Sequence, residues 1–294
     1  MKIHIPKHYF RHHTRSIVYE GIVNNPESQY CDDPEEADWI FLTAPKHLLE
    51  KYKVWAQKII LVDFEDQREL WEEEPLSQSC SYPHRFYFKR SIVDKVRGEE
   101  ATLRKYTQIV YPITFSLKTE PLQFKDILKE TRLTDISLFF GNKIHYYRDL
   151  VSEKVYTYFK DNYCVHQGII GQDGSPGRNS IQDEYYQKMR NSKIVVTCNP
   201  DNWEGDYRLF EALSCGCLVF CDQLYANIAH PFIHQKHLIY YNRDNLDSLL
   251  KDIDYYLNNS NEREQIARDG YLFAKQYHGN SHRIDEILNV IRTK

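Results

Sequence analysis

The chain has 294 residues, which suits one large domain or two ordinary ones, and 41% of them are hydrophobic, enough to form a sizeable core. Its formal net charge is −4. Because this balance gives no strongly basic face, we expect no nucleic-acid partner. No apolar run reaches membrane-spanning length, and the first residues lack the apolar segment of a signal peptide, so we expect no transmembrane segment.

Seven cysteines, an odd number in a long chain, favour reduced thiols and a cytoplasmic location. Cys215, Cys217 and Cys221 are close enough in sequence to be considered as metal ligands. However, Cys217 and Cys221 bound the apolar run CLVFC, which is typical of a buried strand. We therefore interpret these thiols as core residues.

The first half of the chain alternates between short apolar runs and helical patterns. We predict strands at residues 2–5, 38–43 and 58–63, and an amphipathic helix at 47–57. Further along, residues 84–93 mix aromatic and basic side chains, and residues 108–117 have the pattern of a strand that continues into an extended linker. Strands that alternate with helices predict a parallel α/β sheet.

The second half repeats this alternation, so we predict a second α/β domain. The expected elements are strands at 135–142, 163–168, 193–200 and 217–222, a glycine-rich loop at 168–180, and helices at 144–162, from 180 to about 191, and at 206–215, 245–259 and 262–278. We place the domain boundary near residues 117–135, which gives domains 1–125 and 126–294. The last helix is the element that can return to the first domain.

The segment NPDNWEGDYRLFEALSCGCLVFCD (199–222) has the clearest functional pattern, in the order strand, loop, helix, glycine and strand. Asp206 is placed to cap the helix, and Arg208 and Glu211 lie one turn apart on one face. A helix N-terminus with a guanidinium suits a diphosphate, and a carboxylate can accept hydrogen bonds from both ribose hydroxyls. The alternative is an ordinary ion pair between Arg208 and Glu211. The position after a strand of an α/β sheet favours the ligand site.

The stretch YYQKMRNSKIVVTCNPDNWEGDYRLFEALSCGCLVFCD resembles the donor-site region of exostosin-like and related glycosyltransferases with the GT-B fold. In those families a serine-lysine strand, an Arg-x-x-Glu helix and a Gly-Cys strand follow one another, here as Ser192 and Lys193, Arg208 and Glu211, and Gly216 and Cys217. The resemblance implies two Rossmann-like domains with mostly parallel sheets that face a central cleft, with the acceptor in the first domain and the nucleotide-sugar in the second. It also implies that Arg208 contacts the donor's phosphates and Glu211 its ribose.

The spacing of two glutamates departs from the pattern of many retaining enzymes with this fold, which have seven residues between them. Here six residues separate Glu204 from Glu211. We therefore expect an inverting reaction, as exostosin-like plant and viral relatives often show.

A second donor-side segment is FFGNKIHYYRD (139–149). Gly141 and Asn142 lie in a predicted strand-to-helix turn where the backbone can approach a phosphate, and Lys143 and Arg148 supply positive charge. The resemblance places a phosphate-binding Arg or Lys in this region. For Arg148 the alternative is a solvated helix residue. The glycines of residues 168–171 either contact the nucleobase or form plain turns.

An inverting transferase needs a general base for the attacking hydroxyl. Asp63 and Asp66 follow the predicted strand at 58–63, at its carboxyl end, and are the preferred candidates. The alternatives, which titrate nearer neutrality, are His8, His12 and His13. Any of these can instead be an ordinary polar loop residue.

We expect no metal ion and no other cofactor. The clear Asp-x-Asp of the chain, Asp252 and Asp254, lies in a helical stretch that turns the two carboxylates to different sides. The leaving diphosphate must then be stabilised by a helix end and basic side chains. Lys89 and Arg90 are expected to bind an anionic group or to support the cleft.

These patterns predict a hexosyl- or pentosyltransferase that moves a sugar from a UDP- or GDP-sugar to a glycan acceptor. The alternative is a non-catalytic protein on the same fold that binds a nucleotide-sugar or a glycan. An NAD-linked enzyme is disfavoured, because no Gly-x-Gly-x-x-Gly turn follows a predicted strand.

Overall fold

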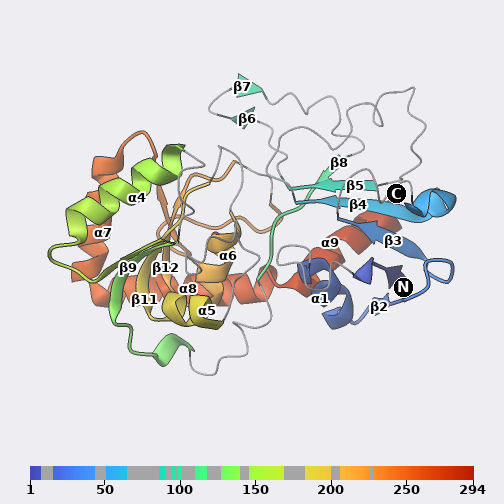
Figure 1. Cartoon of the computed structure of the whole chain (residues 1–294), viewed down its shortest axis with the longest axis horizontal. Helices are drawn as coiled ribbons and strands as arrows, with labels where there is room; N and C mark the ends of the chain where they lie inside the picture. The colour runs from blue at the N-terminus through green and yellow to red at the C-terminus, as the bar shows by residue number, and fades with distance from the viewer. Residues whose placement is uncertain are drawn as a thin grey trace. The chain divides into compact units, whose positions relative to one another are not determined.

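The computed structural model describes residues 1–7, 16–43, 51–64, 86–90, 95–96, 99–100, 110–117, 127–139, 146–168, 183–199, 206–225 and 228–294. The chain divides into two compact units (Figure 1). Unit 1 comprises Met1–Ser116, Tyr225–Ala229 and Gly279–Lys294, and unit 2 comprises Leu117–Leu224 and His230–His278. Both ends of the chain therefore belong to unit 1.

Unit 1 contains a parallel sheet of six short strands in the order β2-β1-β3-β4-β5-β8. The strands are β1 (Lys2–His4), β2 (Gln29–Tyr30), β3 (Trp39–Leu42), β4 (Ile59–Asp63), β5 (Phe86–Lys89) and β8 (Val110–Pro112). Strands β4 and β5 are buried along their whole length, which explains their continuous apolar runs. A separate antiparallel pair consists of β6 (Lys95–Val96) and β7 (Glu99–Glu100).

The helices of unit 1 come from distant parts of the sequence. They are α1 (Ser16–Asn24), the 3-10 helix η2 (Lys53–Lys58) and α9 (Asn280–Thr293). Helices α1 and α9 pack against each other, and Figure 1 shows them side by side. A Cβ atom on Gly21 would lie 2.6 Å from the backbone oxygen of Asn280, so glycine permits this close approach.

Unit 2 contains a second parallel sheet, in the order β10-β9-β11-β12-β13. Its strands are β9 (Thr134–Leu138), β10 (Val165–Gln167), β11 (Ser192–Val196), β12 (Leu218–Asp222) and β13 (Ile239–Tyr241). Its helices are η5 (Ile127–Lys129), α4 (Tyr146–Phe159), α5 (Asp183–Arg190), α6 (Tyr207–Ser214), α7 (Leu246–Asn258) and α8 (Ser260–Tyr277). Figure 1 shows α4 and α7 together on one side of the strands and α5, α6 and α8 on the other.

The core of unit 2 forms where these helices cover the sheet. Val151, Val155 and Phe159 of α4 pack with the strands and with α7, and each is at most 1% exposed. Full burial of one such side chain contributes about 1.5–3 kcal/mol, so this layer fixes the sheet that carries the site. The thiols of Cys215, Cys217 and Cys221 are buried too, as their interpretation as core residues predicts.

The parallel α/β architecture agrees with the prediction from the alternating pattern, but several elements were missed. Helix α1 and strands β2, β5 and β13 were not predicted as such. In the described part of the predicted helix at 47–57, residues 53–58 form a 3-10 helix with non-helical dihedral angles at Trp55. Residues 118–126 lie outside the described residues, so the boundary at 125/126 stays a prediction. No helix within the described ranges is both long and apolar enough to cross a bilayer.

Candidate functional site

The candidate site lies at the carboxyl edge of the unit 2 sheet, where β11, β12 and β13 end. After β11 the chain runs through Thr197, Cys198 and Asn199, and α6 begins after Asp206. Asp206 has extended dihedral angles (φ −73°, ψ 167°), and its Oδ1 accepts a hydrogen bond from the N–H of Leu209 at 3.1 Å. Asp206 is therefore the N-cap of α6, as predicted.

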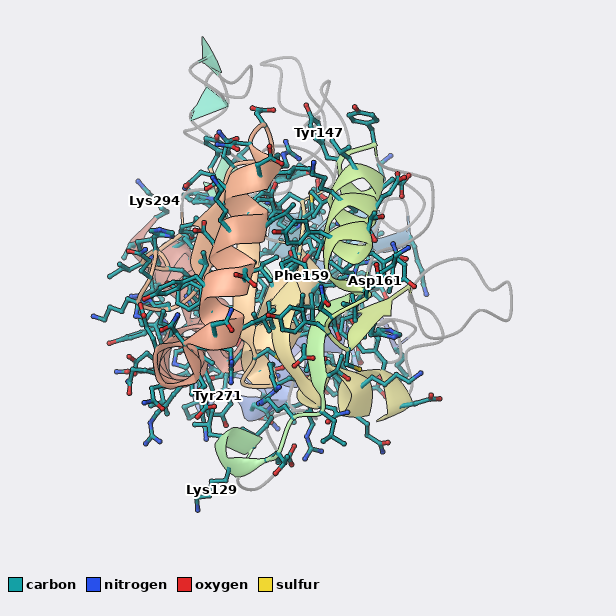
Figure 2. All side chains as sticks on the ribbon, turned by 90° about the vertical axis from the view of Figure 1, so that its left-hand side faces the viewer. Lys129, Tyr147, Phe159, Asp161, Tyr271 and Lys294 are labelled. Carbon is teal, nitrogen blue, oxygen red and sulfur yellow. The ribbon has the colours of Figure 1, made fainter. Side chains whose placement is uncertain are left out.

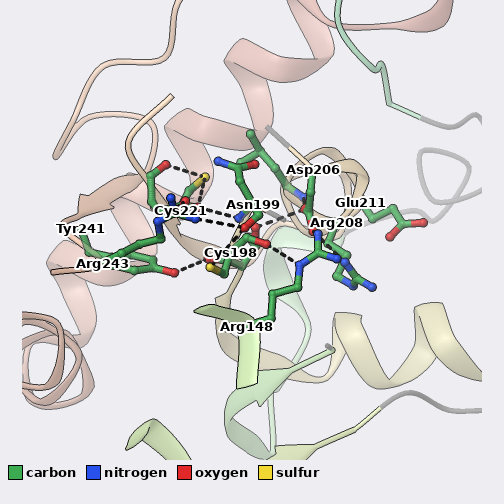
Figure 3. Close-up of polar contacts among 12 residues, drawn as sticks. Arg148, Cys198, Asn199, Asp206, Arg208, Glu211, Cys221, Tyr241 and Arg243 are labelled. Carbon is green, nitrogen blue, oxygen red and sulfur yellow. Dashed lines mark hydrogen bonds and ion pairs between the residues drawn. The ribbon is translucent and has the colours of Figure 1, made fainter. Parts of the chain in front are cut away.

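Asp206 also holds two arginines. Its Oδ2 lies 2.7 Å from Nη1 of Arg208 and 3.0 Å from Nη2 of Arg148, which comes from α4 (Figure 3). The Nε of Arg148 donates to the backbone oxygen of Cys198 at 2.8 Å, and the hydroxyl of Thr197 donates to Oδ1 of Asp206 at 3.2 Å. Two guanidinium groups and one carboxylate leave one positive charge within this trio, at a helix end that adds its own partial positive charge.

Glu211 lies one turn further along α6 and points away from Asp206 (Figure 3). Its Oε2 accepts a hydrogen bond from the hydroxyl of Tyr185 at 2.7 Å, and its Oε1 accepts one from Tyr186 at 3.3 Å. Both tyrosines belong to α5, and Glu211 is 1% exposed. The alternative interpretation was a surface ion pair between Arg208 and Glu211. Glu211 is instead buried and bonded to two tyrosines, and Arg208 pairs with Asp206.

A second ion pair lies beside the first, between Asp222 at the end of β12 and Arg243 after β13. Oδ2 of Asp222 is 3.4 Å from Nε of Arg243, and its Oδ1 accepts the N–H of Asn199 at 2.8 Å. The guanidinium of Arg243 lies 4.1 Å from the ring centre of Tyr147 in α4. Neither Asp222 nor Arg243 was among the predicted site residues. The sequence signal for a site role was their position: Asp222 ends the predicted strand at 217–222, and Arg243 follows the short apolar run of β13.

Two buried polar groups near this edge make no hydrogen bond within the described part of the chain. They are the side-chain amide of Asn199, at both its nitrogen and its oxygen, and Nε2 of His166 in β10. Asn199 is only 1% exposed. Burial lowers the pKa of His166, which favours the neutral imidazole, and its ring centre lies 5.1 Å from that of Phe139. Buried groups of this kind cost about 1–3 kcal/mol each, and a ligand is one way to satisfy them.

Several predicted site residues cannot be placed. Those outside the described residues are Gly141, Asn142, Lys143, Asp66, His8, His12, His13 and Glu204. Of the predicted donor-site residues, the structure brings Arg148 and Arg208 together on Asp206, and it places Glu211 on the same helix as Arg208. Their role in binding stays a prediction.

Asp63, a predicted general base, lies in unit 1 at the end of β4. Its side chain is fully buried, forms an ion pair with Nζ of Lys89 at 2.9 Å and accepts the hydroxyl of Tyr87 at 2.7 Å. Arg90 is also buried and donates to the backbone oxygen of Phe64 at 3.0 Å. These contacts hold β4 to β5 and enclose the carboxylate of Asp63.

Comparison with known proteins finds a family that matches part of the chain. Residues 166–289 match the family described as glycosyl transferase-like, and this stretch contains β11, α6 and β12. No curated protein sequence matches the chain.

Solved glycosyltransferase structures are similar in fold. An α-glucosyltransferase in complex with UDP-glucose and DNA containing an abasic site matches with a TM-score of 0.63, at 10% identity over 100% of both chains. An α1,3-fucosyltransferase matches with a TM-score of 0.58, at 12% identity over 100% of this chain and 89% of that chain. Anabaena HepE in complex with UDP and glucose matches with a TM-score of 0.55, at 10% identity over 88% of this chain and 79% of that chain.

The expectation that nucleic acid is excluded as a partner is wrong. The α-glucosyltransferases that share this fold are seen in complexes with DNA. The net charge of a whole chain does not fix the charge of one surface, so it does not exclude a nucleic-acid partner. A chain with a net charge of −4 can still carry a local basic region.

The two parallel α/β units match both domains of these enzymes, whereas the narrower assignment to exostosin-like proteins stays a prediction. The chain therefore has the GT-B fold of glycosyltransferases, and its residues 166–289 carry the sequence pattern of the glycosyl transferase-like family.

Proposed function

We propose that this protein is a hexosyl- or pentosyltransferase that binds a nucleotide-sugar at the carboxyl edge of the unit 2 sheet and passes the sugar to a glycan acceptor. The observation that carries the proposal is the pair of guanidinium groups, from Arg148 and Arg208, on the single carboxylate of Asp206. A diphosphate is the ligand whose charge and oxygen atoms fit such a pair at a helix N-terminus.

The same groups suit the chemical step. When the bond between the sugar and the diphosphate breaks, negative charge accumulates on the leaving diphosphate. Guanidinium groups fixed in advance by Asp206 and by the backbone oxygen of Cys198 stabilise that charge without having to reorganise. The side-chain amide of Asn199, which makes no hydrogen bond within the described residues, is available to the same ligand as donor and acceptor.

Glu211 is proposed to bind the ribose. The hydroxyls of Tyr185 and Tyr186 hold its carboxylate in one orientation. A carboxylate has enough lone pairs to accept from these tyrosines and from the two ribose hydroxyls together. Because UDP or UDP-glucose is bound in the α-glucosyltransferase and HepE structures of this fold, UDP-sugars are the first donors to test, and GDP-sugars the second.

The test of the donor site compares two substitutions of the same kind. Glu211→Gln removes the charge of the proposed ribose ligand, and Glu184→Gln removes the charge of an exposed glutamate on α5 that pairs with Lys188. We expect Glu211→Gln to raise the KM for the UDP-sugar about tenfold or more, since a hydrogen bond to a charged group contributes about 1.5–3 kcal/mol. Release of UDP from a panel of donors is the measurement, and Glu184→Gln should match the unchanged protein.

Glu211 is buried, so a second variant separates binding from folding. Tyr185→Phe leaves the carboxylate in place but removes one of its partners, and we expect a smaller rise in the KM. If Glu211→Gln remained folded and kept the full activity of the unchanged protein, the ribose role would be wrong. Donor binding by calorimetry without turnover on any acceptor, DNA included, would instead favour the non-catalytic alternative.

We further propose that transfer needs no metal ion, because Arg148, Arg208 and the N-terminus of α6 supply the positive charge that a metal would otherwise bring. Protein treated with EDTA should therefore keep its turnover within about twofold. Activity that disappears with EDTA and returns with Mn²⁺ or Mg²⁺ would contradict this.

The proposed stereochemistry is inversion, which rests on the spacing of Glu204 and Glu211. Asp63 and Asp66 remain the proposed candidates for the general base. Proton NMR of the first product formed would report the anomeric configuration directly, and a product with the configuration of the donor would overturn the assignment.

A further inference from the structure

A cavity of about 750 Å³ lies at the opposite edge of the unit 2 sheet from the nucleotide site. Its lining includes Arg132 before β9, Lys193 at the start of β11 and Gly216 before β12, which are all at the amino ends of strands. The proposed nucleotide site lies at the carboxyl ends. Figure 2 shows this separation, with Lys129 of the cavity at the bottom of the molecule and Tyr147, which stacks on Arg243, at the top.

The cavity is positively charged in a chain that is negatively charged overall. Its cationic lining residues are Lys129, Arg132, Lys193, Arg263 and Arg268, against the acidic residues Glu130 and Glu264. The lining carries an excess of three positive charges in a chain whose net charge is −4, and one of its cations, Lys193, is paired with Asp135, outside the lining, at 2.7 Å. A concave surface of one sign concentrates ions of the opposite sign.

The acidic side chains in the cavity are already engaged. Glu130 accepts a hydrogen bond from Nε of Arg190, which is not part of the lining, at 3.2 Å, and Glu264 accepts from Arg263 at 3.2 Å. They are therefore poorly available to neutralise the other cations of the cavity.

Within the described residues no carboxylate pairs with Arg132, whose contacts are mostly with backbone oxygens. Its Nη1 donates to the oxygens of Arg190 and Ser192 at 2.7 and 2.8 Å, and its Nη2 donates to that of Cys215 at 2.9 Å. Carbonyl oxygens satisfy the donors of a guanidinium without neutralising it. The half-buried Arg132 thus places a fixed positive charge at the base of the cavity.

Arg268 is an accessible cation of the set, as is the exposed Lys129. Arg268 is exposed on α8 and, within the described part of the chain, forms neither an ion pair nor a hydrogen bond. The first turn of α8 contributes Asn261 to the same lining, so the partial positive charge of a helix N-terminus adds to the guanidinium groups. Helix N–H groups, guanidinium and ammonium together suit phosphate oxygens.

We propose that this cavity, formed by η5, the segment before β9 and the first half of α8, is a binding site for a small, multiply phosphorylated ligand. The site is separate from the nucleotide-sugar site and does not depend on the proposed transferase activity. Its volume falls in the range of about 300–1,000 Å³ that is usual for small-molecule sites.

The test is calorimetric titration of the full-length protein with sodium tripolyphosphate, in the presence of excess UDP to occupy the proposed nucleotide site. Three variants are compared. Arg268→Glu reverses an accessible charge of the cavity, and Lys275→Glu makes the same change seven residues along α8, at an exposed residue outside the lining. Arg208→Gln alters only the nucleotide site. We expect saturable binding that Arg268→Glu weakens about tenfold or more, whereas the other two variants stay within about twofold of the unchanged protein.

Any of the following outcomes would overturn the proposal. The first is no saturable binding of tripolyphosphate to the unchanged protein at millimolar concentration. The second is equal affinity in Arg268→Glu and Lys275→Glu, which would indicate a general charge effect. The third is binding that Arg208→Gln abolishes and Arg268→Glu leaves intact, which would place the anion at the nucleotide site. Citrate that bound more tightly than tripolyphosphate would replace phosphate with carboxylate as the ligand chemistry.

Discussion

Asp222 shows at the scale of one residue how the end of a strand supports the site. Burial raises its pKa to about 7, although Arg243 and the N–H of Asn199 both act to lower it. The same carboxyl fixes the backbone at Asn199, where the chain leaves β11 towards α6, and it holds Arg243 over Tyr147. Asp222 is therefore a positioning residue for the edge that carries the proposed donor site.

The raised pKa makes the stability of the protein depend on pH. Between about pH 4 and 7 the folded protein keeps a proton on Asp222 that the unfolded chain releases. The stabilisation that this proton gives to the folded protein is therefore complete below about pH 4 and is lost as the pH rises through 7. Within the window the free energy of unfolding should fall by about 1.4 kcal/mol per pH unit from this group. Asp222→Asn should lack this component, and urea unfolding at a series of pH values measures the difference. Parallel curves for the two proteins would contradict the shift.

At the scale of one element, α8 depends on a glycine for its closeness to the rest of unit 2. A Cβ atom on Gly270 would collide with the backbone oxygen of His237. Helix propensity alone favours alanine over glycine by about 0.8–1 kcal/mol. Here the contact is with backbone, which cannot move aside as a flexible side chain could, so the clash outweighs the propensity.

We therefore expect Gly270→Ala to lower the free energy of unfolding by about 1–3 kcal/mol. Lys275→Ala, at an exposed position of the same helix, should change it by no more than about 0.5 kcal/mol. The urea midpoints of both variants give the comparison. A Gly270→Ala protein more stable than the unchanged one would show that propensity wins and that α8 does not approach His237 this closely.

At the scale of the whole molecule, unit 1 is closed by the last helix of the chain. Ile284, Ile287 and Leu288 of α9 are at most 1% exposed, and Nε of Arg283 donates to the backbone oxygen of Phe115 at 3.0 Å. Each of these aliphatic side chains contributes about 1.5–3 kcal/mol by burial, so α9 is part of the core of unit 1 rather than an appendage.

Removal of residues 279–294 should therefore unfold or loosen unit 1 while unit 2 stays folded. Hydrogen exchange measured by mass spectrometry should show lost protection in α1 and β1 and retained protection in β9, β11 and β12. Removal of residues 293–294 alone, which are exposed, should leave all of these unchanged. Equal loss of protection in both units would mean that they do not fold separately.

The sequence by itself determined the alternation of strands and helices, the N-cap at Asp206 and the arrangement of Arg208 and Glu211 on one helix, because these depend on residues within a few turns of each other. It also indicated the buried thiols. The short strands β2 and β13 and the helix α1 escaped prediction, because two- or three-residue strands and a weakly patterned helix carry little periodic signal.

Only the tertiary structure decided which side chains meet. Arg148 reaches Asp206 from 58 residues away, Tyr185 reaches Glu211 from 26 residues away, and α9 joins α1 from the far end of the chain. The cationic cavity likewise combines the segment before β9 with α8. Such contacts follow from the order of strands in a sheet and from the packing of helices on it, and no local pattern encodes either.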